Sequence, residues 1–120
     1  MSETSLVFTG DIGFDKYMAG KWDDTDLLNT EVATFLEDCD HLCVNVEGPL
    51  LAKTADEAKG PLRHSMDPAA AGFLNRIGAD VWNICTNHIM DAGAEGMENT
   101  LKLAAKCGAK TLGAGMNLAE

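Results

Sequence analysis

Three polar side chains follow an apolar run in the second half of the sequence. The run at residues 81–84 leads into Asn87 and His88, and Asp91 follows three residues after the histidine. The amide offers a neutral oxygen, and the imidazole offers a nitrogen that binds borderline metals. The same residue types are common in turns, so the group is either a ligand cluster or a turn. Asp91 either caps a following helix or orients the imidazole of His88, and we expect such a supporting role over direct ligation.

Two acidic residues take equivalent places after earlier apolar runs. Asp11 follows the run at residues 6–8, and Glu47 follows the run at residues 42–46. Open α/β sheets bind ligands just beyond the carboxyl ends of their strands, so these acids and His88 should converge at one edge. Carboxylates brought close together repel one another, and a bound cation removes that cost. Oxygen ligands combined with imidazole favour Mn²⁺, Fe²⁺ or Zn²⁺. The alternative for Asp11 is a turn or helix-cap residue.

The elements that must position these side chains alternate along the chain. The apolar runs predict four strands, at residues 6–8, 42–46, 81–84 and 110–112. Helices are predicted between them, at residues 26–39, 67–77 and 94–107. Strands that alternate with helices in the order β-α-β-α-β-α-β imply an α/β fold with a mainly parallel sheet and right-handed crossovers.

Local signals set the expected helix ends. Thr25 or Asp26 can cap the first helix, and Asp67 followed by Pro68 marks the start of the second, with Gly78 as its stop. The first helix is expected to turn one apolar face inward, with the i, i+4, i+7, i+8, i+11 spacing of an amphipathic helix. The residues on this face are Leu28, Val32, Phe35, Leu36 and Cys39.

Two loops follow strand ends, at residues 12–26 and 51–65. The second loop carries Lys59, Arg63 and His64, which could meet an anionic substrate, but we expect a solvated loop there. His41 stands at a strand start and is expected at the opposite end of the sheet from the site.

Composition excludes several classes of partner. The 120 residues carry nine basic and nineteen acidic side chains, a formal charge of −10, which argues against nucleic acid or an anionic membrane as a partner. We find no apolar run of membrane-spanning length and no secretory signal, and the four cysteines form no C-x-x-C pair. These features predict no membrane insertion, a reducing environment and a cytoplasmic location.

The motifs together resemble a known family. They are Gly10-Asp11, Asn45-Val46-Glu47-Gly48-Pro49-Leu50, Thr86-Asn87-His88 with Asp91, Gly93 and Gly96, and Gly113-Ala114-Gly115 with Asn117. This series is similar to the bacterial capsule-synthesis protein family, the CapA or PgsA type linked to poly-γ-glutamate capsules. The resemblance implies a metallophosphoesterase-like domain with four layers, two sheets between helices, and a two-metal site at the strand ends.

Carried over position by position, the resemblance implies a divalent-metal site and catalytic residues. The metal positions would be Asp11, Glu47, Asn87 and His88. His88 would be a ligand or an acid for the leaving oxygen, and His88 with Asp91 are the candidate catalytic residues. The substrate would be a phosphoester or another small anion.

Three departures from the family pattern shape the expectations. Thr86 stands where the pattern usually has asparagine, there is no signal or anchor although relatives often act at the membrane or outside it, and later histidine motifs are absent. We therefore expect residues 1–120 to form one domain that is the N-terminal half of a larger one. Its metal site would be weak or partial, and the chain alone inactive. The rival reading is a non-catalytic half-domain that binds a partner or itself, and a homodimer is expected in either case.

Overall fold

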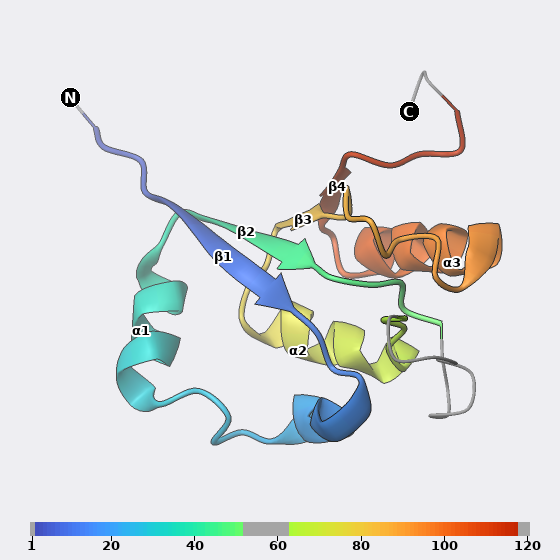
Figure 1. Cartoon of the computed structure of the whole chain (residues 1–120). Helices are drawn as coiled ribbons and strands as arrows, with labels where there is room; N and C mark the ends of the chain where they lie inside the picture. The colour runs from blue at the N-terminus through green and yellow to red at the C-terminus, as the bar shows by residue number, and fades with distance from the viewer. Residues whose placement is uncertain (1, 52–62, 118–120) are drawn as a thin grey trace.

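The computed structural model describes residues 2–51 and 63–117 of the chain. Four parallel strands form one sheet in the order β1-β2-β3-β4, with the helices between them in sequence (Figure 1). This confirms the predicted α/β class and the alternation of strands and helices. The strands are β1 (Leu6–Ile12), β2 (His41–Val46), β3 (Val81–Asn83) and β4 (Lys110–Leu112). The helices are α1 (Thr30–Asp38), α2 (Ala71–Arg76) and α3 (Gly93–Lys106), with short 3₁₀ turns at Lys16–Met18, Lys21–Asp23 and Pro68–Ala70.

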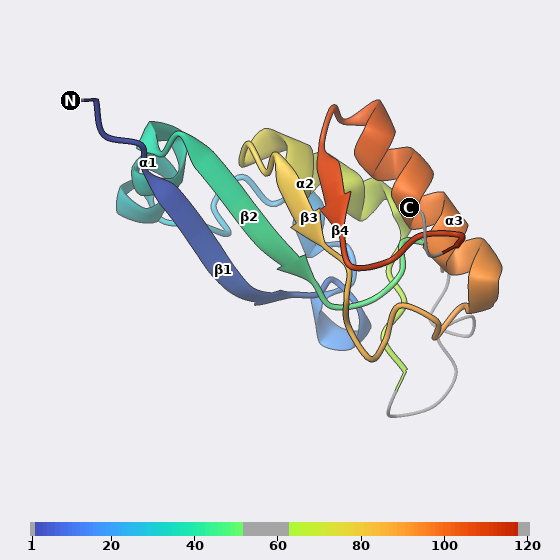
Figure 2. The same ribbon diagram turned by 90° about the horizontal axis from the view of Figure 1, so that it is seen from above.

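The helices lie together on one side of the sheet. Each strand pairs with its neighbour in sequence, and right-handed crossovers in a single direction place every connecting helix on the same face. Figure 2 shows α1 and α2 behind the strands and α3 beside β4. Along β2, Leu42, Val44 and Val46 are buried toward the helices, whereas Cys43 and Asn45 between them are partly exposed. The core therefore lies between this face and the helices, with Trp82 of β3 fully buried in it.

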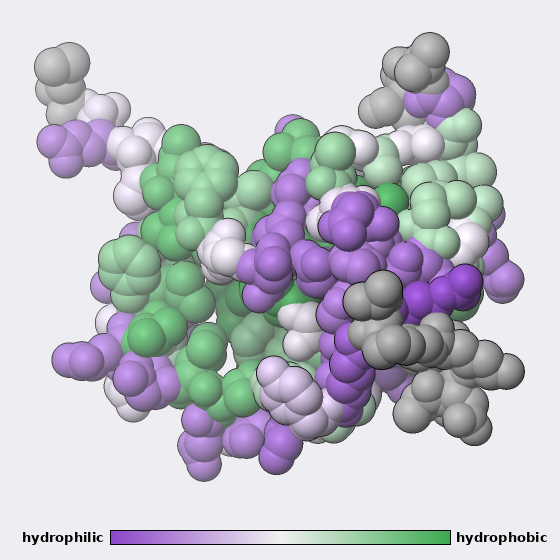
Figure 3. Space-filling view, in the orientation of Figure 1, coloured by the Kyte–Doolittle hydropathy of each residue, from purple (hydrophilic) through white to green (hydrophobic). Residues whose placement is uncertain are grey.

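The other face of the sheet is open in the described part of the chain. Leu6 and Phe8 on β1 are 59% and 71% exposed, and Leu112 on β4 is 52% exposed. Figure 3 shows apolar surface gathered over β1 and α1. The prediction of a short buried strand at residues 6–8 is wrong on both counts, since β1 runs to Ile12 and its outer face is uncovered. Apolar runs of this kind are typical of strands covered on both faces, but here helices cover one face.

Helix α1 begins later than predicted and packs loosely. Asn29 is its N-cap and accepts a hydrogen bond from the Val32 backbone N–H at 2.9 Å, so the predicted start at Thr25 or Asp26 is wrong. The competing cap lies one turn further along, and Asp24 instead accepts the Asp26 N–H in a turn. All nine residues of α1 are described and none is buried. Of the expected inward face, Val32 and Phe35 are exposed.

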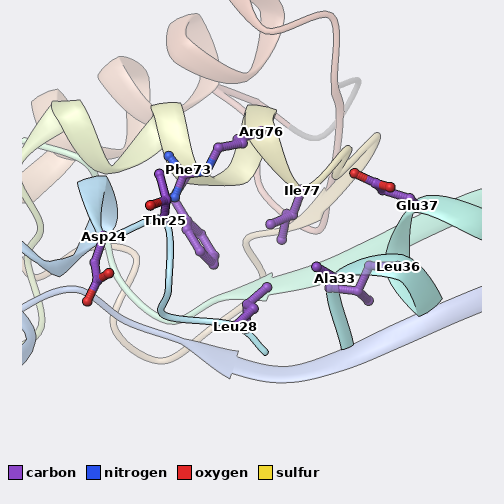
Figure 4. Close-up of a pocket in the computed structure, with 9 residues that line it drawn as sticks. All are labelled: Asp24, Thr25, Leu28, Ala33, Leu36, Glu37, Phe73, Arg76 and Ile77. Carbon is purple, nitrogen blue, oxygen red and sulfur yellow. The ribbon is translucent and has the colours of Figure 1, made fainter. Parts of the chain in front are cut away.

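A cavity of about 180 Å³ separates α1 from α2. Figure 4 shows Ala33 and Leu36 of α1 on one side of it and Phe73 and Arg76 of α2 on the other. A second hollow of about 360 Å³ continues from it beneath β1. Val32, Ala33 and Leu36 of α1 line these two hollows, so this side of the helix is not closely packed.

The local signals for α2 and α3 give the correct ends to within about a turn. The Asp67 carboxylate accepts the Ala69 backbone N–H at 2.8 Å, and Pro68 opens the 3₁₀ turn that runs into α2. Gly78 has φ +78°, as expected of a glycine that ends a helix, and Gly108 after α3 has φ +74°. These ends fix where β3 and β4 begin, and so where the segments that follow them leave the sheet.

Candidate metal centre

A β-bulge decides which way the Asp11 side chain points. Phe8 pairs with Cys43 and Asp11 pairs with Asn45, so β1 carries one extra residue between these pairs. The extra residue places Asp11 on the open face beside Asn45 and turns Ile12 toward the helices. Asp11 is therefore inside β1, one residue before its end, and not beyond the strand as predicted.

Amide side chains connect three strands on the open face. Asn83 Nδ2 donates to Asn45 Oδ1 at 2.6 Å, and Asn45 Nδ2 donates to Asp11 Oδ1 at 2.6 Å. The same Asn45 amide lies 3.5 Å from Glu47 Oε2. Because its oxygen accepts from Asn83, the Asn45 amide has its donor side toward the two carboxylates. Neither asparagine is among the predicted site residues. They are register partners on β2 and β3, and this equivalent position near the ends of two strands is the signal that could have identified them.

Glu47 lies directly beyond β2, as predicted. Its backbone N–H donates to the Ile12 carbonyl at 3.1 Å, and its own carbonyl accepts from Thr86 Oγ1 at 3.0 Å. Burial raises the pKa of the Glu47 carboxyl, and the nearby Asp11 charge raises it further, against the opposing effect of His88 and His64. A cation bound nearby would offset the unfavourable free energy of ionising the Glu47 carboxyl.

His88 and Asp91 form a hydrogen-bonded pair beyond β3. His88 Nδ1 lies 2.7 Å from Asp91 Oδ2, and His88 Nε2 lies 3.6 Å from Glu47 Oε1. Helix α3 has Ala92 at its N-cap with no side-chain cap bond, so Asp91 orients the imidazole, the second of the two alternatives. Burial raises the pKa of Asp91, but hydrogen bonds from the His64 backbone and from His88 outweigh it, and the pKa is lowered.

Asn87 is exposed beside this pair. Its Nδ2 lies 3.1 Å from His88 Nε2, on the side of the ring that faces Glu47. The amide is therefore adjacent to the predicted ligand nitrogen. Figure 2 shows the segments after β2, β3 and β4 leaving the sheet on the same side, at the carboxyl ends of the strands. Residues from different strands meet here for that reason.

His64 is a site residue that the sequence motifs do not predict. Its Nδ1 lies 2.8 Å from Asp15 Oδ2, its backbone N–H donates to Asp91 Oδ2 at 2.7 Å, and its ring meets the His88 ring edge-on at 4.4 Å. The prediction of a solvated loop is therefore wrong for His64, although Arg63 is exposed as expected. Lys59 lies outside the described residues.

The segment that carries His64 is fixed by non-local contacts. Leu50 and Met66 form an isolated parallel bridge, and the Met66 N–H donates to the Pro49 carbonyl at 2.9 Å. A Cβ on Gly48 would overlap the His64 carbonyl, so the close approach requires glycine at that position. No local sequence pattern announces this pairing.

Glu47, His64 and His88 form a group able to hold a metal ion. Their ligand atoms all lie within 4.8 Å of one another. One carboxylate with two imidazoles suits Zn²⁺, Mn²⁺ or Fe²⁺. Beside the group, the buried Asp15 Oδ2 has no hydrogen-bond partner among the described residues and lies 2.8 Å from His64 Nδ1. The donor set and this excess of negative charge fit a divalent cation.

The remaining predicted positions lie around this group or far from it. Asp11 is joined to Glu47 through Asn45, and Asn117 is exposed beyond β4. His41 pairs with Asp80 at 2.8 Å at the other end of the sheet, as expected. In the part of the chain that the structure describes, no helix is long and apolar enough to cross a membrane.

Comparison with known proteins agrees with the motifs. Residues 5–120 match the family model of the bacterial capsule synthesis protein PGA_cap. The chain is also 27% identical over 99 residues to the capsule biosynthesis protein CapA of Bacillus anthracis. That alignment covers 80% of this chain and 24% of the relative, so the chain spans about a quarter of the relative's length. Because the family model matches nearly the whole sequence, the chain belongs to the bacterial capsule synthesis protein family.

Proposed function

We propose that this chain acts in the biosynthesis of a poly-γ-glutamate capsule and supplies part of a divalent-metal-dependent phosphoesterase-type site. The observation that supports the proposal most directly is the 3.6 Å approach of Glu47 Oε1 to His88 Nε2, from the ends of two neighbouring strands. A carboxylate and an imidazole so placed are a common start of a metal site. The name of the Bacillus relative supports the assignment to capsule biosynthesis.

The residues that would hold the metal are Asp11, Glu47, Asn87 and His88. A bound divalent ion supplies Lewis-acid activation of a phosphoryl oxygen and of water. Asp91 accepts from His88 Nδ1 and thereby directs Nε2 toward Glu47, either as a ligand or as an acid for the leaving oxygen. Asn45 holds the Asp11 carboxylate in place.

The charge of the site explains why an anionic substrate would need the metal. Asp11 and Glu47 lie close together in a chain of net charge −10, and such a surface repels phosphate. A divalent ion reverses the local field. The substrate class we propose is therefore a phosphoester or another small anion presented to the metal.

Calorimetric titration with Mn²⁺ and Zn²⁺ tests the proposal. We expect residues 1–120 to bind at most one ion, loosely, and to release it to a chelator without unfolding. His88→Ala and Glu47→Gln should each weaken binding at least about tenfold, whereas His41→Ala, a histidine with its own carboxylate partner, should leave binding unchanged. If neither Mn²⁺ nor Zn²⁺ gave a heat of binding, the proposed metal site would be wrong.

Phosphodiester turnover is the second readout. With a chromogenic phosphodiester and Mn²⁺, we expect turnover by residues 1–120 to be absent or very low, because the chain covers about a quarter of the relative. Any turnover should be lost in the Asp11→Asn, His88→Ala double variant. Full activity in that variant would show that the site has been wrongly placed.

A non-catalytic role is the second candidate, and the open face of the sheet favours it. Leu6 and Phe8 present apolar side chains on a face that no described element covers. A module that binds a partner or itself would use such a surface. Self-association together with an absence of metal binding would favour this role over the first.

A further inference from the structure

We propose that His64 is a direct metal ligand, so that it joins Glu47 and His88 in the proposed site for one divalent first-row metal. This inference rests on the proposed metal-dependent function and names a ligand that the family motifs in this sequence do not include. Each of the three ligands comes from a different part of the chain, beyond β2, before α2 and beyond β3. The ligand atoms lie within 4.8 Å of one another, close enough for one ion to reach all three.

One carboxylate, that of Asp91, contacts both histidines. Asp91 Oδ2 accepts the His64 backbone N–H at 2.7 Å and lies 2.7 Å from His88 Nδ1. The contacts fix the backbone of His64 and the ring of His88, and the rings meet edge-on at 4.4 Å. A carboxylate behind a histidine ligand is the usual support of such a site, because it sets the ring orientation and raises the basicity of the ligand.

The backbone around His64 is built for a close approach to Glu47. Gly48 lacks the Cβ that would strike the His64 carbonyl, and the bridge between Leu50 and Met66 seats residue 64 against the end of β2. Leu50 is itself fixed from α3, since its N–H donates to Thr100 Oγ1 at 2.8 Å. Residue 64 is therefore held against the segment after β2 by the close approach of Gly48 and by the bridge from Leu50 to Met66.

A histidine in a solvated loop would not be enclosed in this way. The His64 side chain is 30% exposed and the Asp15 side chain 11%, so the pair is removed from most of the solvent. Asp15 Oδ2 is buried, faces the His64 ring and finds no hydrogen bond among the described residues. Negative charge that is buried without a hydrogen bond is costly, and a cation bound to the adjacent ring reduces the cost.

The ligand set predicts the kind of metal. Two imidazoles and one carboxylate are the protein ligands of many zinc sites, with a further position left for water or substrate. The same ligand set with open coordination positions also binds Fe²⁺, and it binds Mn²⁺ with lower affinity. We therefore expect Zn²⁺ to bind more tightly than Mn²⁺, and Co²⁺ to give a visible absorption spectrum when it replaces Zn²⁺.

The three histidines of the chain allow a direct test by NMR. Zn²⁺ added to the ¹⁵N-labelled chain should shift or exchange-broaden the ring resonances of His64 and His88 together, and leave those of His41 unchanged. A shift of His88 without His64 would overturn the His64 ligand while leaving the proposed metal-dependent function standing. Unchanged resonances for all three histidines would overturn both.

Affinity measurements give the second test. His64→Ala and His64→Gln should lower Zn²⁺ affinity at least about tenfold and weaken the Co²⁺ spectrum, with His41→Ala as the matched control. Circular dichroism of each variant without metal establishes whether it is folded. If the His64 variants do not fold, the NMR experiment on the unaltered chain decides the question. Wild-type affinity in a folded His64→Ala variant would contradict the proposal.

Discussion

Asp11 and Asn45 face each other across β1 and β2, with Asp11 Oδ1 2.6 Å from Asn45 Nδ2. The contact exists because the bulge in β1 returns Asp11 to the open face. Without the extra residue, the strand's alternation would turn this carboxylate into the helix-covered core and Ile12 out to solvent. A single inserted residue therefore determines that Ile12 packs toward the core and that the Asp11 carboxylate lies next to the site.

The amide of Asn45 should matter to metal binding more than to stability. Asn45→Ala frees the Asp11 carboxylate to rotate and is expected to lower Mn²⁺ affinity about tenfold. Asn83→Ala acts one hydrogen bond further away, so its effect should be smaller. Asn75→Ala, on the exposed side of α2, is the control. If calorimetry gave Asn45→Ala the Mn²⁺ affinity of the wild type, Asp11 would not be part of the metal site.

Two phenylalanines should differ sharply in their contribution to stability. Phe73 is 5% exposed and its ring packs on Phe14 at 4.8 Å, whereas Phe35 on α1 is 62% exposed. Phe73→Ala should lower the free energy of unfolding by about 3–5 kcal/mol, and Phe35→Ala by less than about 0.5 kcal/mol. Urea unfolding followed by circular dichroism measures both. Equal losses would mean that α1 packs more tightly than the cavity indicates.

Stability should fall in acid partly through Asp80. The hydrogen bond from His41 lowers the pKa of the Asp80 carboxyl, and the Leu42 backbone N–H adds to this against the opposing effect of burial. A group whose pKa is lower in the folded chain contributes stability above its unfolded pKa. That contribution is lost as pH falls through the folded value. Asp80→Asn should therefore destabilise the chain at pH 7, and the difference from wild type should shrink toward pH 2. The pair is partly exposed, so the effect should be small and weaker at high salt. A difference in unfolding midpoint that stays constant across this pH range would contradict the assignment.

The open face should make the chain self-associate. We expect a symmetric dimer, by edge pairing or swapping, because β1 and β4 are the edge strands and Phe8 is exposed beside Leu6. Phe8→Ser should shift the chain toward monomer in light scattering after size exclusion. Tyr17→Ser removes an aromatic side chain that is 87% exposed in a 3₁₀ turn away from the sheet, and should leave the mass unchanged. A monomer at every micromolar concentration would refute the dimer.

Local signals account for what the sequence predicts correctly. Asp67 and Pro68 act within one turn of chain, as does Gly78. The sequence predicts β2 and β3 correctly because their apolar runs are bounded by polar residues. His88 and Asp91 are three residues apart, so their pairing could also be anticipated. Features of this kind depend on neighbours in sequence, which a pattern can describe.

The missed features depend on distant parts of the chain. His64 reaches the site through the bridge between Leu50 and Met66, which no periodicity announces. The direction of Asp11 depends on a bulge whose register is set by β2. The predicted start of α1 is wrong because Asn29 and Asp26 are both good caps within one turn, and the sequence does not rank them.

The sequential order of the strands has a consequence for how the chain is made. Each strand after β1 pairs with the strand synthesised just before it, so the sheet can grow one strand at a time as the polypeptide leaves the ribosome. The ligand groups would then arrive in order, with Glu47 in place before His64 and His88 emerge. Ion capture can follow only once the segment beyond β3 has been translated, which makes loading a late step in the maturation of the chain.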